Sequence, residues 1–121
     1  MSVTQDELDQ FTGTTQYYIR PIFPHFRYTD GIQFLAEEGK CHWLIDFVFS
    51  HQLDPAVKEY SQRENFQVWR LKVNDDSTAV ITCEDGNDNI IMQREIVYTD
   101  FPLQKLTLFF QDGVLFLPSE Y

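Results

Sequence analysis

Apolar and polar positions alternate differently in the two halves of the chain. From Phe66 onward apolar residues recur in short runs with a period near two, which is typical of β-strands. Polar turns separate the runs FQVWRLKV, TAVITC, NIIMQREIVY, LTLFF and VLFL. Because the joints are short and Asp112-Gly113 is a hairpin signal, we expect an antiparallel meander of about five strands over residues 66–118.

The first half carries helix signals instead. Thr4 and Glu7 have the spacing of a capping box, which predicts a short helix at the start of the chain. A second helix is expected over residues 31–38, with Asp30 near its beginning and Gly39 as its C-cap.

A longer helix is predicted over residues 41–52, because CHWLIDFVFSHQ is apolar on almost every side, as in a helix buried against a sheet. Asp54 followed by Pro55 marks the start of one more helix, which should run to about Tyr60. Between the first two helices, residues 17–28 contain two prolines and should form an extended aromatic connector.

Helices followed by strands is the order of an α+β fold. We therefore predict a single domain over residues 1–121, with a helical layer over about 1–61 packed on an antiparallel sheet over about 66–118. The chain has an ordinary domain length of 121 residues, and 11 Phe, 6 Tyr and 2 Trp supply large side chains for a core. Helix 41–52 is expected to lie across one face of the sheet.

The net charge of the chain disfavours anionic partners. The chain has 19 Asp and Glu residues against 9 Lys and Arg, which gives a net charge of -10 at pH 7. The acidity is spread over both halves of the sequence, so long-range electrostatics oppose binding to nucleic acid or to an anionic membrane. An acidic soluble surface explains this charge, and mimicry of DNA by a small inhibitor is the alternative.

Nothing in the sequence indicates export or a familiar catalytic motif. Cys41 and Cys83 do not form a CxxC pair, residues 1–10 do not resemble a signal peptide, and no apolar stretch is long enough to span a membrane. A cytoplasmic protein is therefore expected. The phosphate-binding, zinc-protease and serine-hydrolase motifs are absent from the sequence, which favours a binding protein over an enzyme and predicts no cofactor.

Three polar residues of helix 41–52 nevertheless deserve a chemical interpretation. His42, Asp46 and Ser50 are four residues apart, so they lie along one seam of the helix. They do not form a catalytic triad, because Asp46 lies in the middle and His42 is about 12 Å from Ser50 along the axis. The seam is either a structural polar strip or a site in which His42 and Asp46 act as an acid/base pair or as part of a metal site.

Other metal interpretations are weaker. Cys41, His51 and His25 do not converge with His42, so we expect no metal site. The oxygen-rich segment EDGNDN, residues 84–89, does not fit an EF-hand loop and is explained better as a hairpin turn.

The connector 17–28 combines aromatic residues with Arg20 and Arg27, which is the local chemistry of single-stranded nucleic-acid binding. With a net charge of -10, a more economical interpretation is that the aromatic rings pack on the core and the arginines pair with surface carboxylates.

Three segments carry a family resemblance: YTDGIQFLAEE at 28–38, HWLIDFVFSHQ at 42–52 and LPSEY at 117–121. Together they resemble a family of small uncharacterised bacterial proteins of about this length, found on chromosomes, plasmids and phages. The resemblance implies a bacterial cytosolic origin, with the gene on a chromosome or on a mobile element, and it names no catalytic residue. The matching positions in the helix segments are Tyr28, Asp30, Gly31, His42, Trp43, Asp46, Ser50 and Gln52.

These observations favour a small acidic interaction protein with a host protein as its partner. The alternative is a small enzyme that uses His42 and Asp46. A homodimer is a second mode of association, through the strand 114–117 if that strand lies at an edge of the sheet. The predicted binding surface consists of polar seam residues flanked by aromatic ones: Tyr28, His42, Trp43, Asp46 and Ser50.

Overall fold

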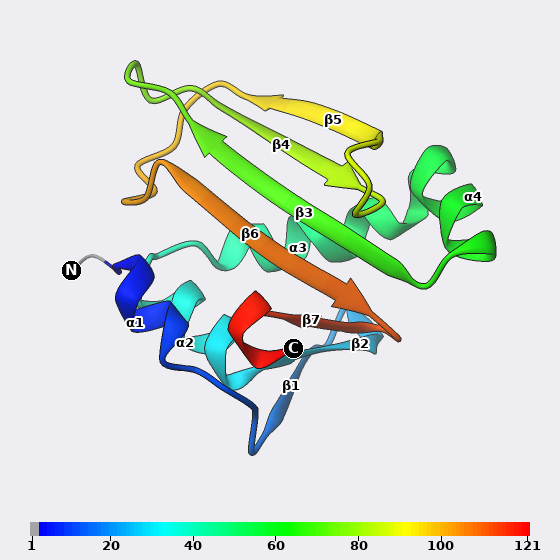
Figure 1. Cartoon of the computed structure of the whole chain (residues 1–121), viewed down its shortest axis with the longest axis horizontal. Coiled ribbons are helices and arrows are strands. Elements are labelled where there is room, and N and C mark those ends of the chain that lie inside the picture. Colours follow the sequence, from blue (N-terminus) through cyan, green and yellow to red (C-terminus); the bar gives the residue numbers. More distant parts are fainter. Residues whose placement is uncertain (1–2) are drawn as a thin grey trace.

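One seven-stranded mixed sheet organises the chain, and helices pack behind it in the view of Figure 1. The structure is a computed structural model that describes residues 3–121, so the first two residues of the predicted helical layer lie outside the described residues. The strands are β1 (Tyr17–Arg20), β2 (Phe23–Thr29), β3 (Phe66–Val73), β4 (Ala79–Glu84), β5 (Ile90–Ile96), β6 (Lys105–Gln111) and β7 (Val114–Phe116). The helices are α1 (Gln5–Asp9), α2 (Asp30–Glu38), α3 (His42–Ser50) and α4 (Pro55–Arg63), with short 3-10 turns at His51–Leu53 (η1) and Pro118–Glu120 (η2).

The predicted α+β class is confirmed, and the strand order refines it. The order across the sheet is β1-β2-β7-β6-β3-β4-β5. Strands β3, β4 and β5 form an antiparallel meander, as expected, and β6 and β7 form a hairpin. The hairpin does not continue the meander, because β6 pairs with β3 on the side opposite β4.

Residues 17–28 are not a connector, and this prediction was wrong. They form the antiparallel pair β1 and β2, and β2 runs parallel to β7. Proline has no backbone N–H to donate to a neighbouring strand. Pro24 is tolerated in β2 because β7 pairs only with Arg27 and Tyr28. The extended conformation was predicted correctly, but pairing with a strand almost ninety residues later leaves no local signal.

The last strand is therefore internal. β7 lies between β2 and β6, so its two edges are occupied, and the condition under which residues 114–117 could pair with a second copy is not met. The edges of the sheet are β1 and β5.

The local helix signals agree closely with the structure. Thr4 and Glu7 form the predicted capping box, and Asp54 caps α4 by accepting from the backbone N–H of Ala56 at 3.0 Å. Helix α4 is slightly longer than predicted and ends at Arg63. The N-cap of α2 is Thr29 rather than Asp30, since the Thr29 hydroxyl accepts from the backbone N–H of Ile32.

Helix α3 provides the centre of the core, as predicted. Leu44, Ile45, Val48 and Phe49 are at most 2% exposed, and Trp69 on the facing strand β3 is 1% exposed. Burial of each such side chain contributes about 1.5–3 kcal/mol. Within residues 3–121, no helix has the length and apolar character needed to cross a membrane.

Candidate binding surfaces

The predicted seam lies on the exposed side of α3. His42, Asp46 and Ser50 are all exposed, and the Asp46 side chain retains 51% of its accessible surface. The Ser50 hydroxyl donates to the backbone carbonyl of Phe47 at 3.1 Å. The seam is therefore a solvated strip, and its serine is engaged by its own helix.

Arg20 of β1 joins the other two seam residues. Its Nη2 lies 3.1 Å from His42 Nδ1 and donates to the His42 carbonyl at 3.2 Å. Its Nε lies 3.2 Å from Asp46 Oδ1, which forms an ion pair, although this N–H does not point at the carboxylate well enough to form a hydrogen bond. This contact confirms that Arg20 pairs with a surface carboxylate. Because guanidinium groups only donate, Nδ1 of His42 acts as the acceptor and is unavailable to Asp46 in this arrangement.

The two aromatic residues of the predicted surface differ in their exposure. Tyr28 is 4% exposed and lies beneath the seam rather than at its margin, because this residue of β2 faces the helices. Its ring stacks on Tyr18, with centroids 5.4 Å apart, and lies 5.7 Å from the Arg20 guanidinium carbon. Trp43 is half-buried and packs edge-on against Phe47. Tyr28 thus supports the seam from below, whereas Trp43 is a neighbour of His42 on α3 itself.

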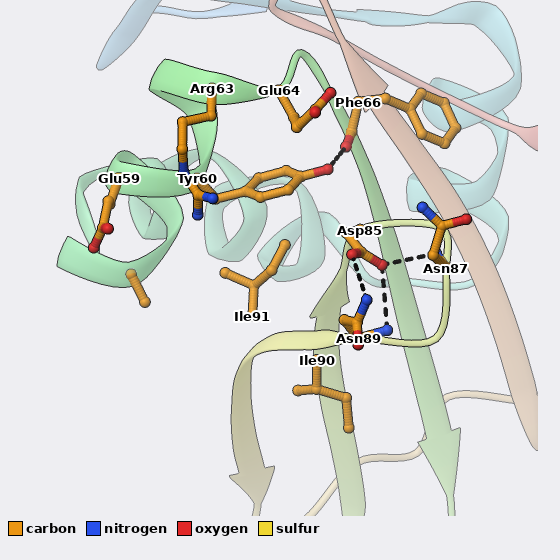
Figure 2. A pocket seen from close by; sticks show the side chains of 11 residues that line it. Glu59, Tyr60, Arg63, Glu64, Phe66, Asp85, Asn87, Asn89, Ile90 and Ile91 are labelled. Atoms are coloured by element: carbon orange, nitrogen blue, oxygen red, sulfur yellow. Dashed lines mark hydrogen bonds between the residues drawn. The ribbon is translucent and has the colours of Figure 1, made fainter.

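A larger candidate site lies between α4 and the turn that joins β4 to β5. Figure 2 shows this cavity, which has a volume of about 560 Å³. Its residues come from one face of α4, from the start of β3, and from the turn and the beginning of β5. They are Ala56, Glu59, Tyr60, Arg63, Glu64, Phe66, Asp85, Asn87, Asn89, Ile90 and Ile91.

The cavity is acidic, because Glu59, Glu64 and Asp85 line it against the single cation Arg63. The Asp85 carboxylate accepts from the side chain of Asn89 at 2.8 Å and from the backbone N–H groups of Asn87 and Asn89. These hydrogen bonds, that of the Asn89 side chain above all, lower the pKa of Asp85 below its ordinary value, so this residue stays charged. They also confirm the predicted turn at residues 84–89.

Tyr60 fixes the distance between α4 and β3 at this cavity. Its hydroxyl donates to the backbone carbonyl of Phe66 at 2.5 Å, and the residue is 7% exposed. Burial, followed by the nearby charge of Asp85, raises the pKa of Tyr60. The tyrosine therefore remains a neutral donor.

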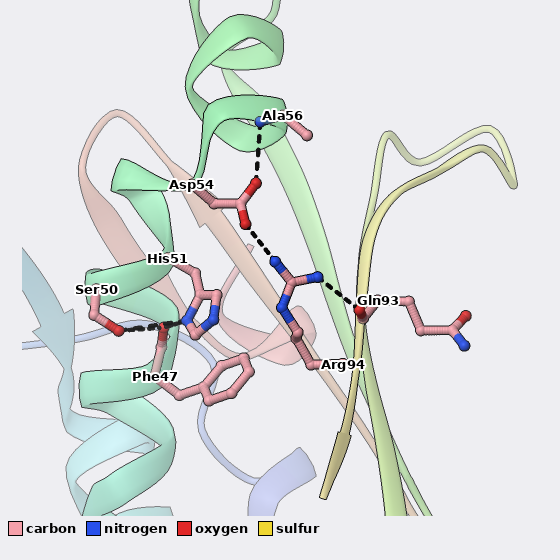
Figure 3. Close-up of polar contacts among 7 residues, drawn as sticks. All are labelled: Phe47, Ser50, His51, Asp54, Ala56, Gln93 and Arg94. Atoms are coloured by element: carbon pink, nitrogen blue, oxygen red, sulfur yellow. Dashed lines mark hydrogen bonds and ion pairs between the residues drawn. The ribbon is translucent and has the colours of Figure 1, made fainter.

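An ion pair that the sequence analysis did not predict fastens α4 to β5 (Figure 3). Arg94 Nη2 lies 2.6 Å from Asp54 Oδ2, while the other oxygen of Asp54 caps α4. The Asp54 side chain is 13% exposed, so this pair is better shielded from water than an ordinary surface ion pair. It holds the helical wall of the cavity against the strand.

His51 has a structural role beside this ion pair. Its ring stacks on Phe47 with centroids 4.0 Å apart, and its Nδ1 lies 2.8 Å from the Phe47 carbonyl. A carbonyl only accepts, so Nδ1 carries a proton in this contact. His51 therefore closes the end of α3.

Metal-ligating residues do not converge in the described part of the chain. Among residues 3–121, His, Cys, Asp and Glu form no group of three or more that could hold a metal ion. Burial raises the pKa of the Cys41 and Cys83 thiols to about 12, whereas a metal binds the thiolate.

A second buried feature, also absent from the sequence analysis, is the amide network around Gln67. Gln67 is 3% exposed and exchanges two hydrogen bonds of 2.9 Å with Gln52. It also binds the Ser61 hydroxyl and accepts from the Trp69 indole N–H. This network lines a cavity of about 270 Å³, and its satisfied hydrogen bonds indicate a structural role.

The comparisons with known proteins identify a family. No curated protein and no solved structure matches the chain. A family model does match, over residues 2–121, and confirms the resemblance to an uncharacterised family that the sequence indicated. The chain belongs to DUF6876, a family of unknown function.

Proposed function

We propose that the protein is a small acidic binding module of the cytoplasm, encoded on a bacterial chromosome or mobile element, whose partner is a cationic segment of another protein. The observation that carries the proposal is the 560 Å³ cavity, which presents three carboxylates in a chain of net charge -10. The local charge and the charge of the whole chain have the same sign, so both attract a basic partner and raise its association rate.

The cavity is a stronger candidate than the seam on α3. His42 and Asp46 are both engaged by Arg20, so their use by a ligand requires displacement of a residue that the fold already employs. The cavity residues Glu59, on α4, and Glu64, directly after the helix, are both exposed to solvent. The seam stays a prediction as a second contact surface.

The test is affinity capture from a nuclease-treated bacterial lysate at low and high salt. We expect a stoichiometric partner whose retention weakens as salt rises, because screening shortens the reach of surface charges. The variant with Glu59→Lys and Glu64→Lys should lose that partner. Lysine near the C-terminus of α4 suits the helix dipole, so this variant should fold.

A matched control separates the cavity from total charge. Asp75 and Asp100 are exposed at the opposite end of the sheet, in the turn after β3 and in the loop after β5. The variant with Asp75→Lys and Asp100→Lys changes the net charge equally and should keep the partner. Equal loss in both variants, a partner that is indifferent to salt, or no captured protein would contradict the proposal.

A further inference from the structure

We propose that the free edge of β5 receives the cationic partner segment as an additional strand of the sheet. This inference rests on the proposed function and specifies how the partner binds. It follows from the position of β5, which is an edge strand and also forms one wall of the acidic cavity at Ile90 and Ile91.

Of the two edge strands, β5 is the better template. It has seven residues, whereas β1 has four. Each edge strand has one register shift, between Tyr18 and Arg20 in the pairing of β1 and at Ile90 to Met92 in that of β5, but Pro21 follows β1 directly and β5 keeps a regular run from Met92 to Ile96. Alternate backbone groups of an edge strand point away from its neighbour, and those groups bind another extended chain.

The beginning of β5 gives the added strand a side-chain site. Ile90 is 57% exposed, which is unusual for an isoleucine of a strand, and Ile91 lies between α4 and the turn in Figure 2. An extended segment that pairs with β5 therefore reaches the cavity at this end. One of its side chains can then enter between Tyr60 and Asp85.

The charges along this path select a cationic occupant. Arg94 of β5 is paired with Asp54, which leaves Glu95 as the charge that β5 presents to solvent. Because side chains alternate along a strand, Glu95 lies on the face opposite Arg94, whereas Glu59, Glu64 and Asp85 supply the carboxylates of the cavity at the beginning of β5. A second copy of the chain is disfavoured at this edge, because two copies would each bring a net charge of -10.

The test uses the full chain and a short synthetic peptide of alternating valine and lysine. Main-chain pairing and charge need no particular side-chain sequence, so the peptide should bind with a Kd of roughly 0.1–1 mM at low salt. Amide hydrogen exchange, followed by NMR, should slow at alternate residues of Ile90–Ile96 and remain unchanged in β1. The same peptide N-methylated at alternate residues should bind at least about tenfold more weakly, since it lacks the donors along one edge.

Each other result overturns the inference in a recognisable way. Equal binding of the methylated peptide, or protection in β1 instead of β5, rules out strand addition at this edge. Absence of binding at millimolar peptide does the same. If both peptides bind equally and the variant with Glu59→Lys and Glu64→Lys loses both, the cationic binding function survives while strand addition fails. A dimer that protects β5 without peptide would identify a second copy as the occupant.

Discussion

The contact between Gly31 and the C-terminal turn should reverse the usual effect of replacing a helical glycine by alanine. In an unobstructed helix, alanine is more favourable than glycine by about 0.8–1 kcal/mol. At Gly31 of α2, an added Cβ would lie 2.6 Å from Leu117 Cδ1 and 2.7 Å from Glu120 Oε1. Both distances are far below van der Waals contact, so one of these groups must move, and we expect Gly31→Ala to destabilise the protein.

The hydrogen bonds of Glu120 set the size of the loss. One carboxylate oxygen accepts from the Thr29 hydroxyl at 2.6 Å and from the Leu117 N–H at 2.9 Å, and the other accepts from the Gly31 N–H at 3.2 Å. Such bonds to a charged group contribute about 1.5–3 kcal/mol when shielded, and Glu120 is only half-buried, so we assign about 1 kcal/mol to each. Loss of two or three bonds, less the gain from alanine, lowers the free energy of unfolding by about 1–2 kcal/mol and Tm by roughly 5 °C.

The assay is urea denaturation followed by tryptophan fluorescence, with two comparisons. Gly31→Ala in a Glu120→Ala background should cost at least about 1 kcal/mol less, because the carboxylate that obstructs the methyl group is gone. Gly13, which has nothing within 4 Å of an added Cβ, is the matched control, and Gly13→Ala should change stability by less than about 0.5 kcal/mol. An increase in stability for Gly31→Ala, or the same loss in both backgrounds, would refute the reasoning.

Two further predictions concern titratable groups. The backbone N–H of Thr15, joined by the hydroxyls of Thr15 and Tyr18, lowers the pKa of Asp30 below its ordinary value of 3.8. A carboxyl group whose pKa is lowered in the folded state stabilises the protein above about pH 4, and this stabilisation is lost as the pH falls through the lowered pKa. In urea titrations, the free energy of unfolding of Asp30→Asn should therefore fall less steeply between about pH 4 and pH 2 than that of the unmodified protein. Burial raises the pKa of Cys41 and Cys83 to about 12. Ellman's reagent at pH 8 should therefore label both thiols only after the protein unfolds. Rapid labelling of the native protein would contradict this prediction, because it would show that the thiols are accessible.

The elements whose signals are local could be predicted from the sequence. The capping box at Thr4, the Asp54-Pro55 start of α4 and the period-two runs after Phe66 each involve neighbours along the chain, and the structure confirms them. The partners of the strands could not be predicted in the same way. β2 pairs with β7 through Arg27 and Tyr28, and β6 lies beside β3. These contacts join distant parts of the sequence, and a periodic pattern specifies an exposed and a buried face of a strand but not its neighbour.

For the candidate surfaces too, the sequence predicts local spacing but not contacts between distant segments. The spacing of His42, Asp46 and Ser50 placed them along one seam but left open whether that seam is exposed, and it gave no sign that Arg20 would contact both His42 and Asp46. The acidic cavity combines α4 with a turn more than twenty residues later, so its carboxylates meet only once the sheet is assembled. The signal that the sequence offers is the acidic turn at residues 84–89, whose composition is also explained by its backbone conformation alone.

The three segments that carry the family resemblance also make contacts that hold the fold together. Residues 28–31 meet the C-terminal segment 117–121 through Glu120, which binds both Thr29 and Gly31. His42 and Asp46 of the second segment hold Arg20 and thereby attach β1 to α3.

The acidic cavity, in contrast, is formed by residues outside all three of those segments, such as Glu59, Glu64 and Asp85. The three segments therefore account for much of the architecture, because their residues make contacts that assemble it. The charges that would select a partner lie elsewhere, on and directly after α4 and in the turn before β5. Exchange of those charges should then redirect binding while leaving the fold intact.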